Sequence, residues 1–205
     1  MKDATPRTID ARTAMTSTPN PTRGLWRYLL PVAALLGLVV FFYLSLGRDM
    51  QTLPSPLIGK PAPQFELPSL ADPAQVISNR ELAGRMYVLN VWGSWCVGCR
   101  QEHDTLIEIA RRGEIPILGL NWKDERAAAQ HWLRSLGDPY IASAFDDEGR
   151  VAIDWGVYGA PETFLVDAAG RIIHKQIGPL DLQIWERDFA PRIRSGRPAG
   201  GAANP

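Results

Sequence analysis

The sequence predicts an α/β domain in which helices cover both faces of one mixed sheet, preceded by a single N-terminal transmembrane helix. Three observations lead to this fold class. An apolar segment, 86–92, is followed at once by a cysteine pair and a helical pattern. A second apolar segment, 115–122, follows that helix, and twenty uncharged residues, 28–47, lie near the N-terminus.

The N-terminal region is expected to comprise a disordered tail at 1–24 and a transmembrane anchor at 25–47. As a helix, the uncharged stretch would span roughly 30 Å, which matches the hydrocarbon thickness of a bilayer. Five basic and two acidic side chains precede it, so the N-terminus is expected in the cytoplasm and the rest outside. A cleaved signal peptide, with small residues Ser45 and Gly47 at the cleavage site, is the alternative.

Hydrophobic periodicity and turn residues predict the remaining elements. Residues 48–63 contain four prolines and are expected to link the anchor to a folded domain at 64–194. The expected strands, in chain order, are 64–67, 86–92, 115–122, 163–166 and 171–177. The expected helical segments are 78–82, 96–112, 125–136 and 182–193.

Three boundaries of these elements depend on particular residues. The helix at 125–136 is expected to be capped by Lys123 or Asp124 and to end at Gly137. Between 138 and 158 the sequence predicts a turn at 146–149 but no further strand. The Gly/Ala/Pro-rich residues 195–205 are expected to be a disordered tail.

Composition narrows the function classes. The chain has 205 residues, of which 45% are hydrophobic, so one domain with a sizeable core is possible. Its formal net charge is zero, and we therefore expect no nucleic-acid partner. Two cysteines separated by two residues cannot join distant segments of a disulfide scaffold.

The two cysteines, Cys96 and Cys99, lie where a strand ends and a helix begins. Side chains three residues apart on a first helical turn share one side and can form a disulfide. Unpaired N–H groups and the helix dipole favour a thiolate there. A Cys-x-x-Cys pair in a βαβ pattern is typical of a thioredoxin-like redox motif. A metal site is the alternative, although the sequence lacks a second Cys or His pair at the usual spacing.

Three stretches carry a family resemblance: 89–103, which holds Trp-Gly-Ser-Trp-Cys-Val-Gly-Cys; 119–124, Gly-Leu-Asn-Trp-Lys-Asp; and 156–167, which begins Gly-Val-Tyr-Gly-Ala-Pro-Glu-Thr-Phe. With them the chain resembles the CcmG/DsbE family of membrane-anchored, thioredoxin-like thiol:disulfide interchange proteins of cytochrome c maturation. The resemblance covers about 58–194 and includes the anchor. The family's dipeptide between the cysteines usually begins with Pro, whereas this chain has Val97-Gly98. That dipeptide tunes the redox potential in such proteins, so the departure bears on the potential and not on the chemistry.

The resemblance implies roles for five residues. Cys96 would be the more exposed, attacking thiol, and Cys99 the buried thiol that resolves the mixed disulfide. Pro161 would follow a cis peptide bond beside the dithiol. Glu102 and Glu162 would be acids of the active site.

Glu102 follows Cys99 by three residues on the same helix, so its ionised carboxylate would oppose formation of the Cys96 thiolate. Asn90 stands in the strand where ordinary thioredoxins carry a buried Asp. An amide cannot accept a proton, which leaves that role to Glu102. The alternatives are a solvated helix residue for Glu102 and an exposed strand-edge residue for Glu162. His103 is expected to be structural, with a metal ligand as the alternative.

These implications define an expected function. The protein would be anchored once in the bacterial inner membrane, with its N-terminus in the cytoplasm and its thioredoxin-like domain in the periplasm. There it would keep the haem-binding cysteines of apocytochrome c, or of a maturation partner, reduced. Its electrons would come from a membrane thiol reductase of the DsbD or CcdA type, and no cofactor or metal is expected. The alternatives are a general periplasmic reductase of the TlpA or ResA type and a copper-binding delivery module that uses the same dithiol.

Overall fold

The structure is a computed structural model that describes residues 22–46 and 56–196, and the chain divides into the units Met1–Asp49 and Met50–Pro205. In the first unit, helix α1 (Thr22–Leu46) begins at Thr22, within the stretch expected to be a disordered tail. The large apolar side chains between 28 and 43 are exposed. In the described part of the chain, no helix is both long and apolar enough to cross a membrane. The expectations for 1–21 and 197–205 fall outside the described residues.

The second unit is built on a five-stranded mixed sheet with the strand order β5-β4-β3-β6-β7. Strands β3, β4 and β5 are parallel, and each successive pair is joined by a helix. Strands β6 and β7 form an antiparallel hairpin, and β6 pairs with β3. Their bounds are β3 (Tyr87–Trp92), β4 (Ile117–Trp122), β5 (Ala142–Asp146), β6 (Glu162–Val166) and β7 (Ile172–Ile177).

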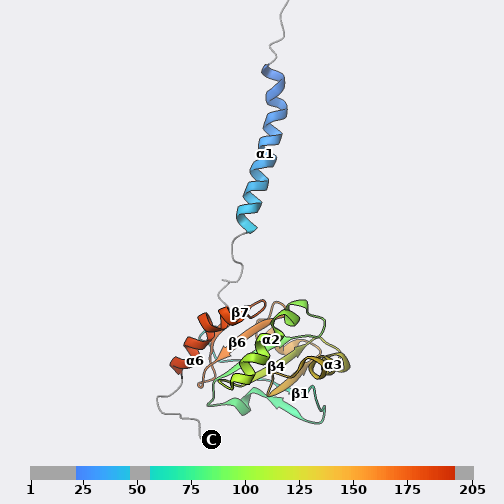
Figure 1. Cartoon of the computed structure of the whole chain (residues 1–205), viewed down its shortest axis with the longest axis vertical. Helices are drawn as coiled ribbons and strands as arrows, with labels where there is room; N and C mark the ends of the chain where they lie inside the picture. The colour runs from blue at the N-terminus through green and yellow to red at the C-terminus, as the bar shows by residue number, and fades with distance from the viewer. Residues whose placement is uncertain (1–21, 47–55, 197–205) are drawn as a thin grey trace, which may run out of the picture. The chain divides into compact units, whose positions relative to one another are not determined.

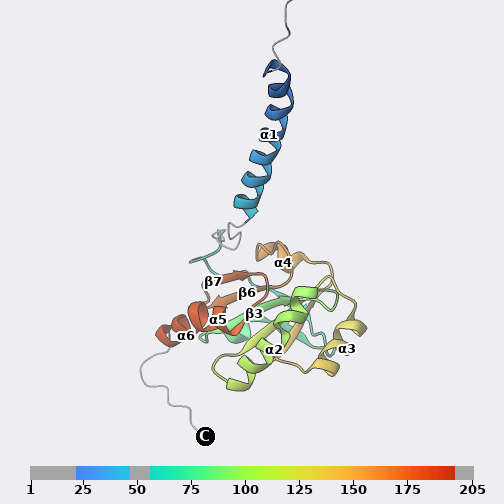
Figure 2. The same cartoon turned by 45° about the horizontal axis from the view of Figure 1, so that its top comes forward.

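Helices cover both faces of this sheet, as expected (Figures 1 and 2). One face carries α2 (Val97–Arg112), α3 (Arg126–Leu136) and a continuous C-terminal segment made of α5 (Leu182–Ile184), η3 (Trp185–Phe189) and α6 (Ala190–Gly196). The other face carries the short helices η2 (Asn79–Leu82) and α4 (Arg150–Asp154). The C-terminal segment replaces the single helix expected at 182–193, with a π-helical turn at η3.

Strand β3 is buried along its whole length because both of its faces are covered. Successive side chains of a strand point to opposite faces, so Val88, Asn90 and Trp92 face α2. Leu89 and Val91 belong to the second core, on the side of α4. This alternation places Asn90 under the helix that begins at the cysteine pair.

Two strands and one helix were not predicted from the sequence. The expected strand at 64–67 is β1 (Glu66–Pro68), which pairs with β2 (Val76–Ser78) outside the central sheet. Strands of three residues are too short to show a period, which explains why β2 was missed. Strand β5 and helix α4 lie in the stretch 138–158, where no strand was expected, because β5 mixes small and polar residues and gains its burial from neighbours.

The second half of the expected linker at 48–63 belongs to the folded domain. Gly59 N–H donates to the Ile172 carbonyl at 2.7 Å, and Ala62 N–H donates to the Gly170 carbonyl at 2.8 Å. These bonds lay 59–62 beside the start of β7, and Ala62 is buried. The proline-containing residues from 59 to 62 are therefore part of the folded domain and not a free linker. Residues 47–55 fall outside the described residues.

The end of α2 and the start of α3 show which residues cap these helices. Helix α2 ends at Gly113, whose φ of 64° is left-handed, a conformation that favours glycine. Helix α3 begins after Glu125, which makes no side-chain cap bond, so the expected cap by Lys123 or Asp124 is wrong. The Asp124 carboxylate is instead engaged by the loop that precedes the cysteine pair.

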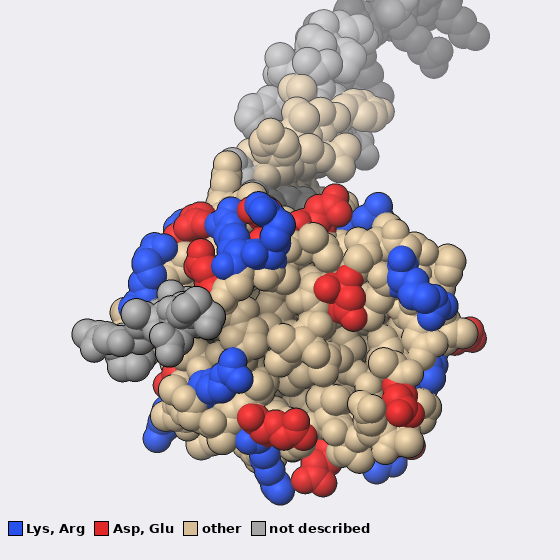
Figure 3. Space-filling model, turned by 60° about the horizontal axis from the view of Figure 1, so that its bottom comes forward, with Lys and Arg blue, Asp and Glu red and all other residues tan. Residues whose placement is uncertain are grey.

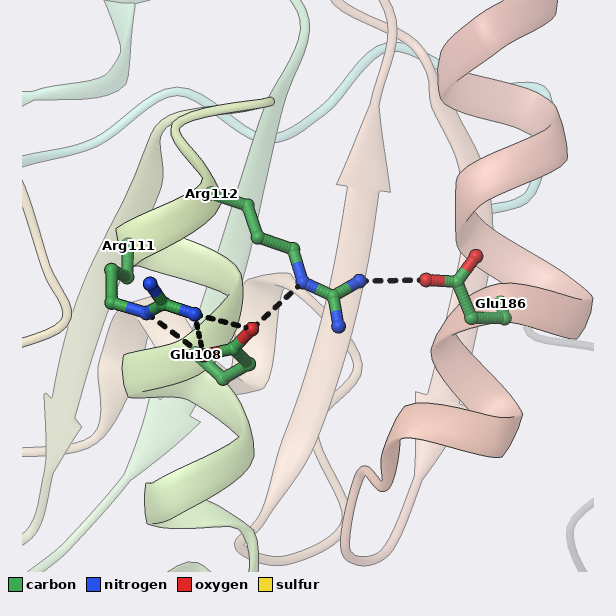
Figure 4. A network of polar contacts seen from close by, with 4 residues as sticks. All are labelled: Glu108, Arg111, Arg112 and Glu186. Atoms are coloured by element: carbon green, nitrogen blue, oxygen red, sulfur yellow. Dashed lines mark hydrogen bonds and ion pairs between the residues drawn. The ribbon is translucent and has the colours of Figure 1, made fainter.

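Ion pairs on the surface connect α2 to the C-terminal segment (Figure 4). Glu108 accepts hydrogen bonds from Arg111 and Arg112, and these bonds hold the pKa of Glu108 below its usual value. Arg112 reaches on to Glu186 at 2.7 Å. Exposed pairs of this kind contribute little to stability individually. Acidic and basic side chains are interspersed on the domain face shown in Figure 3.

Candidate active site

The cysteine pair forms a disulfide at the N-terminus of α2. Cys96 is the N-cap residue, and the Cα atoms of Cys96 and Cys99 are 5.2 Å apart. The Cys99 N–H donates to Cys96 Sγ at 3.0 Å. When the disulfide is reduced, that N–H and the helix dipole would stabilise a thiolate on Cys96.

The expected contrast in exposure between the two cysteines is not seen in this oxidised form. Cys96 is 4% exposed and Cys99 is 3% exposed. Both lie in the core between α2 and the sheet. What distinguishes Cys96 is its position at the cap, where its sulfur accepts the N–H of Cys99, one of the free N–H groups in the first turn of α2.

Gly98 brings the cysteine pair close to Pro161. The Ala160–Pro161 peptide bond is cis, as the family resemblance implied. A Cβ atom on Gly98 would lie 2.8 Å from Pro161 Cδ and 3.3 Å from Pro179 Cγ, so a side chain there requires one of these rings to move. The glycine between the cysteines thus has a packing role: it allows close approach of α2 to the loop before β6.

The loop before Cys96 is held by the loop after β4. Asp124 accepts from Ser94 N–H and Ser94 Oγ, both at 2.6 Å, and from Asn121 Nδ2 at 2.9 Å. The indole N–H of Trp95 donates to the Lys123 carbonyl at 3.0 Å. Asp124 therefore positions the residues that lead into the redox centre.

Apolar side chains around the cysteine pair remain exposed. Trp95 and Val97 flank Cys96 in sequence and are 51% and 74% exposed. Tyr158, in the loop that leads to Pro161, is 68% exposed. Exposed aromatic groups beside a reactive pair suit a surface that receives another polypeptide.

Glu102 is fully buried one turn after Cys99, so the alternative of a solvated helix residue is wrong. Its Oε1 accepts from Asn90 Nδ2 at 2.8 Å, and its Oε2 accepts from the Leu180 N–H at 2.8 Å. Helical spacing places its Cβ about 5–6 Å from that of Cys99. A titratable carboxyl group thus lies behind the dithiol.

Burial raises the pKa of Glu102 to about 7, against the lowering effect of the hydrogen bonds from Asn90 and Leu180. From the sequence, this carboxylate was expected to be ionised. The structure shows instead that it changes charge near neutrality, because desolvation disfavours the charged form. The expected opposition to the Cys96 thiolate therefore sets in as the pH rises through about 7.

We expect Glu102→Gln to remove a pH dependence of stability. The pKa is raised on folding from 4.5 to about 7, so the stability contribution is full below pH 4.5 and is lost as pH rises through 7. The loss for the wild type relative to the variant amounts to roughly 3 kcal/mol. Urea unfolding of both oxidised proteins between pH 4 and pH 9 measures it.

The same variant tests the electrostatic effect on the thiol. Above pH 7 the wild-type carboxylate should hold the pKa of Cys96 higher than glutamine does, so Glu102→Gln should lower it and make the cysteine couple more oxidising. Thiolate absorbance against pH and equilibration with glutathione give the two quantities. If wild type and Glu102→Gln show the same dependence of stability on pH and the same pKa of Cys96, the role assigned to Glu102 is contradicted.

Glu162 lies on the opposite face of the sheet from Glu102. Its Oε1 accepts from Tyr158 N–H at 2.9 Å, and its Oε2 is 2.8 Å from Lys175 Nζ. Lys175 also donates to the Gly156 carbonyl at 2.7 Å. Both side chains of the pair are almost fully buried, so the alternative of an exposed strand-edge residue is wrong. Glu162 holds the loop that carries Tyr158 and does not join Glu102 behind the dithiol.

His103 has a structural environment. Trp132 Nε1 donates to His103 Nδ1 at 3.3 Å, which leaves Nε2 to donate to the Gly137 carbonyl at 3.1 Å. Burial lowers its pKa, so the neutral ring joins α2 to the end of α3. Within 22–46 and 56–196, no group of three or more His, Cys, Asp or Glu side chains is placed to hold a metal ion.

The sequence did not predict three residues of the site, Thr163, Tyr140 and Lys175. Thr163 accepts from Asn90 Nδ2 at 3.0 Å, and Tyr140 donates to Asn90 Oδ1 at 2.8 Å. Tyr140 and Lys175 lie far along the chain from their partners, so only the packed fold brings them there. The stretch 119–124, which contributes to the family resemblance, already contained Asp124.

Comparison with known proteins agrees with this geometry. Residues 57–188 match the Redoxin family. The thiol:disulfide interchange protein DsbE of Allochromatium vinosum is 46% identical over 175 residues, which cover 84% of this chain and 97% of that protein. The DsbE protein of Pseudomonas aeruginosa is 46% identical over 163 residues, covering 80% and 90%.

Solved structures show the same fold at lower identity. A thioredoxin-family thiol:disulfide interchange protein from Chlorobium tepidum is 22% identical, with a TM-score of 0.55 over 66% of this chain and 94% of that chain. A secreted thiol-disulfide isomerase from Corynebacterium glutamicum is 22% identical, with a TM-score of 0.61 over 72% and 94%. The expected thioredoxin-like α/β fold with a mixed sheet is thereby confirmed.

Proposed function

Because this chain belongs to the Redoxin family, and within it to the DsbE (CcmG) thiol:disulfide interchange proteins, we propose that it is the periplasmic reductant of cytochrome c maturation. That it is a thiol:disulfide oxidoreductase follows from the family and from the Cys96–Cys99 disulfide. The observation that carries the proposal is this disulfide at the cap of α2, with a buried carboxyl group one turn behind it.

The reaction of the reduced form follows from the cap geometry. The Cys96 thiolate attacks one sulfur of the partner's disulfide, which forms a mixed disulfide and releases the partner's other sulfur as a thiolate. Cys99 then loses its proton and attacks Cys96 Sγ. The partner leaves with two thiols and has gained two electrons. The loss of these electrons converts Cys96 and Cys99 to the disulfide seen here.

Glu102 favours the reducing direction. A strong oxidant of this type stabilises its reduced form through a low-pKa thiolate at the helix N-terminus. Above about pH 7 an ionised Glu102 opposes that thiolate, which makes the dithiol a better electron donor. Its carboxylate can also take up the proton that Cys99 must lose.

The partner that suits this chemistry is a polypeptide disulfide. We propose the oxidised haem-binding Cys-x-x-Cys-His motif of apocytochrome c, or a thiol partner of the maturation machinery, received on the exposed surface of Trp95, Val97 and Tyr158. Reoxidised protein would be reduced again by a membrane thiol reductase of the DsbD or CcdA type. These assignments rest on the resemblance of the stretches 89–103 and 156–167 to the family.

We place the domain in the periplasm, tethered to the bacterial inner membrane by a single span at 25–47 with the N-terminus in the cytoplasm. The support is the uncharged stretch 28–47 and the basic residues before it. The large apolar side chains between 28 and 43 of α1 are exposed. The span itself is inferred from the sequence, since no helix among the described residues is long and apolar enough to cross a membrane. An oxidising compartment is also where a dedicated reductant is needed.

A complementation experiment tests both the function and the anchor. In a bacterium that lacks this chain, covalently bound haem c should fall, and the full chain should restore it. A version that begins at Met50, with no export segment, should fail although it folds and accumulates, because it stays in the cytoplasm.

The controls separate the possible causes. An added small-molecule thiol should partly restore haem c in the deletion strain, since the missing step is a reduction. Normal haem c without the chain, or full rescue by the version that begins at Met50, would refute the proposal. A general loss of periplasmic reduction with normal haem c would favour the TlpA/ResA-type alternative.

A further inference from the structure

A continuous chain of buried hydrogen bonds runs from Tyr140 to the carboxyl group behind the dithiol. Tyr140 Oη donates to Asn90 Oδ1 at 2.8 Å, and Asn90 Nδ2 donates to Glu102 Oε1 at 2.8 Å. The second N–H of the Asn90 amide donates to Thr163 Oγ1 at 3.0 Å. The Leu180 N–H occupies the remaining oxygen of Glu102.

We propose that Tyr140 is a positioning residue of the redox site: its hydroxyl holds the Asn90 amide with the NH₂ group toward Glu102, and so sets how readily that carboxyl group takes up a proton. This inference rests on the proposed function, because it concerns proton uptake by the carboxyl group beside the same dithiol.

The orientation of the Asn90 amide decides which form of Glu102 is favoured. With NH₂ toward the carboxyl group, both oxygens of Glu102 accept one N–H each, which suits the ionised form. With the amide turned over, Asn90 Oδ1 would face Glu102 and would suit the protonated form, whose O–H needs an acceptor. Tyr140 opposes that turn, because its hydroxyl donates to Oδ1 on the far side.

Tyr140 is well placed to act as a fixed donor. Its ring stacks on Trp92 with centroids 5.5 Å apart and an interplanar angle of 18°. Burial raises the pKa of Tyr140 well above its usual value, so the hydroxyl keeps its proton. A donor to Oδ1 also polarises the amide and strengthens its N–H bond to the carboxylate.

The titratable groups near this network come from several elements. The helix that carries Glu102 also carries the two cysteines and His103, whose neutral ring is engaged by Trp132 and Gly137. Strands β3 and β6 supply uncharged groups, and the segment before α5 supplies a backbone N–H. The segment before β5 supplies Tyr140 and, next to it, Asp138, whose carboxylate accepts from the Tyr140 N–H.

The test is Tyr140→Phe in purified, oxidised, full-length protein. Infrared absorption of the protonated carboxyl group, followed against pH, reports Glu102, and Glu102→Gln identifies its band. We expect the midpoint to rise by about 0.5–1 pH unit in Tyr140→Phe, because the ionised form loses part of its support. A role confined to packing would lower the melting temperature and leave the midpoint where it is.

The chain offers a matched control in Tyr87→Phe. Tyr87 is also a buried tyrosine at the sheet, and its hydroxyl accepts from Asn79 Nδ2 at 3.4 Å in the core on the opposite face. This variant should leave the midpoint of Glu102 unchanged. An unchanged or lowered midpoint in Tyr140→Phe, or an equal shift in both variants, would overturn the inference.

A second measurement decides the matter if Tyr140→Phe does not fold. In the wild type, the side-chain amide resonances of Asn90 should shift with the same midpoint as Glu102. If the Asn90 resonances do not shift as Glu102 titrates, the inference is overturned. Disulfide exchange measured on the same proteins separates the two proposals: failure of this inference leaves exchange and haem c intact, whereas failure of the proposed function leaves haem c independent of the chain.

Discussion

Cys99→Ser is expected to accumulate a covalent complex with the partner, whereas Cys96→Ser is expected to form none. Cys96 caps α2, where its sulfur accepts the Cys99 N–H, so the attacking thiolate belongs there. Without Cys99 the mixed disulfide cannot be resolved from within the chain. Non-reducing electrophoresis of cells that express each variant, followed by identification of the captured protein, gives the result.

The double variant Cys96→Ser/Cys99→Ser is the control for capture that does not involve the redox centre. Because both cysteines are equally buried in the oxidised form, the prediction rests on the cap geometry and not on exposure. If Cys96→Ser accumulates the complex and Cys99→Ser does not, the roles of the two sulfurs are reversed. A captured apocytochrome c or maturation protein would support the proposed function, and a captured unrelated protein would count against it.

Lys175→Met is expected to destabilise the folded domain by about 3–5 kcal/mol, because it leaves the buried carboxylate of Glu162 without its partner. The side chains of the pair are 2% and 1% exposed, and Lys175 also holds the Gly156 carbonyl. Its ammonium group lies 4.6 Å from the centroid of the Tyr158 ring. Urea unfolding of the oxidised protein at pH 7 measures the loss.

Two further variants make this prediction specific. Lys175→Met with Glu162→Gln should recover part of the stability, because the unpaired charge is gone. Lys60→Met, at an exposed lysine, should change stability by less than about 0.5 kcal/mol. In Lys175→Met molecules that remain folded, the loop from Gly156 to Pro161 should be looser and the mixed disulfide should form more slowly. Equal stability of Lys175→Met and the wild type would show that the pair is not needed to hold this loop.

Local patterns identified most of the central sheet because those elements depend on their own residues. The run at 86–92 and the apolar spacing after Cys96 predicted β3 and α2 with small errors at the ends. Strand β5 could not be found in this way, since its sequence, Ala-Ser-Ala-Phe-Asp, has no clear period and it is buried by what packs on it. Strand β2 was missed for want of length.

In the candidate site, too, some features follow from local sequence and others depend on long-range packing. The spacing of Cys96 and Cys99 and their place at a strand–helix junction are local, so the sequence alone predicted the redox pair. The close approach of Gly98 to Pro161 was not predictable, because it depends on where the loop before β6 packs on α2. The cap of α3 was misassigned since Asp124 is drawn to Ser94, thirty residues away.

The sequence by itself determined that this protein carries a dithiol on the first turn of a helix, with one acid, Glu102, three residues after it and a second, Glu162, far along the chain. Tertiary structure decided what those acids do. Glu162 and Thr163 are neighbours in β6, yet alternation along the strand sends Glu162 to Lys175 on one face and Thr163 to Asn90 on the other. Glu102 titrates near neutrality because packing removes water from it, and Tyr140 reaches the same network across fifty residues. Desolvation and long-range contact belong to the folded chain, so no local pattern contains them.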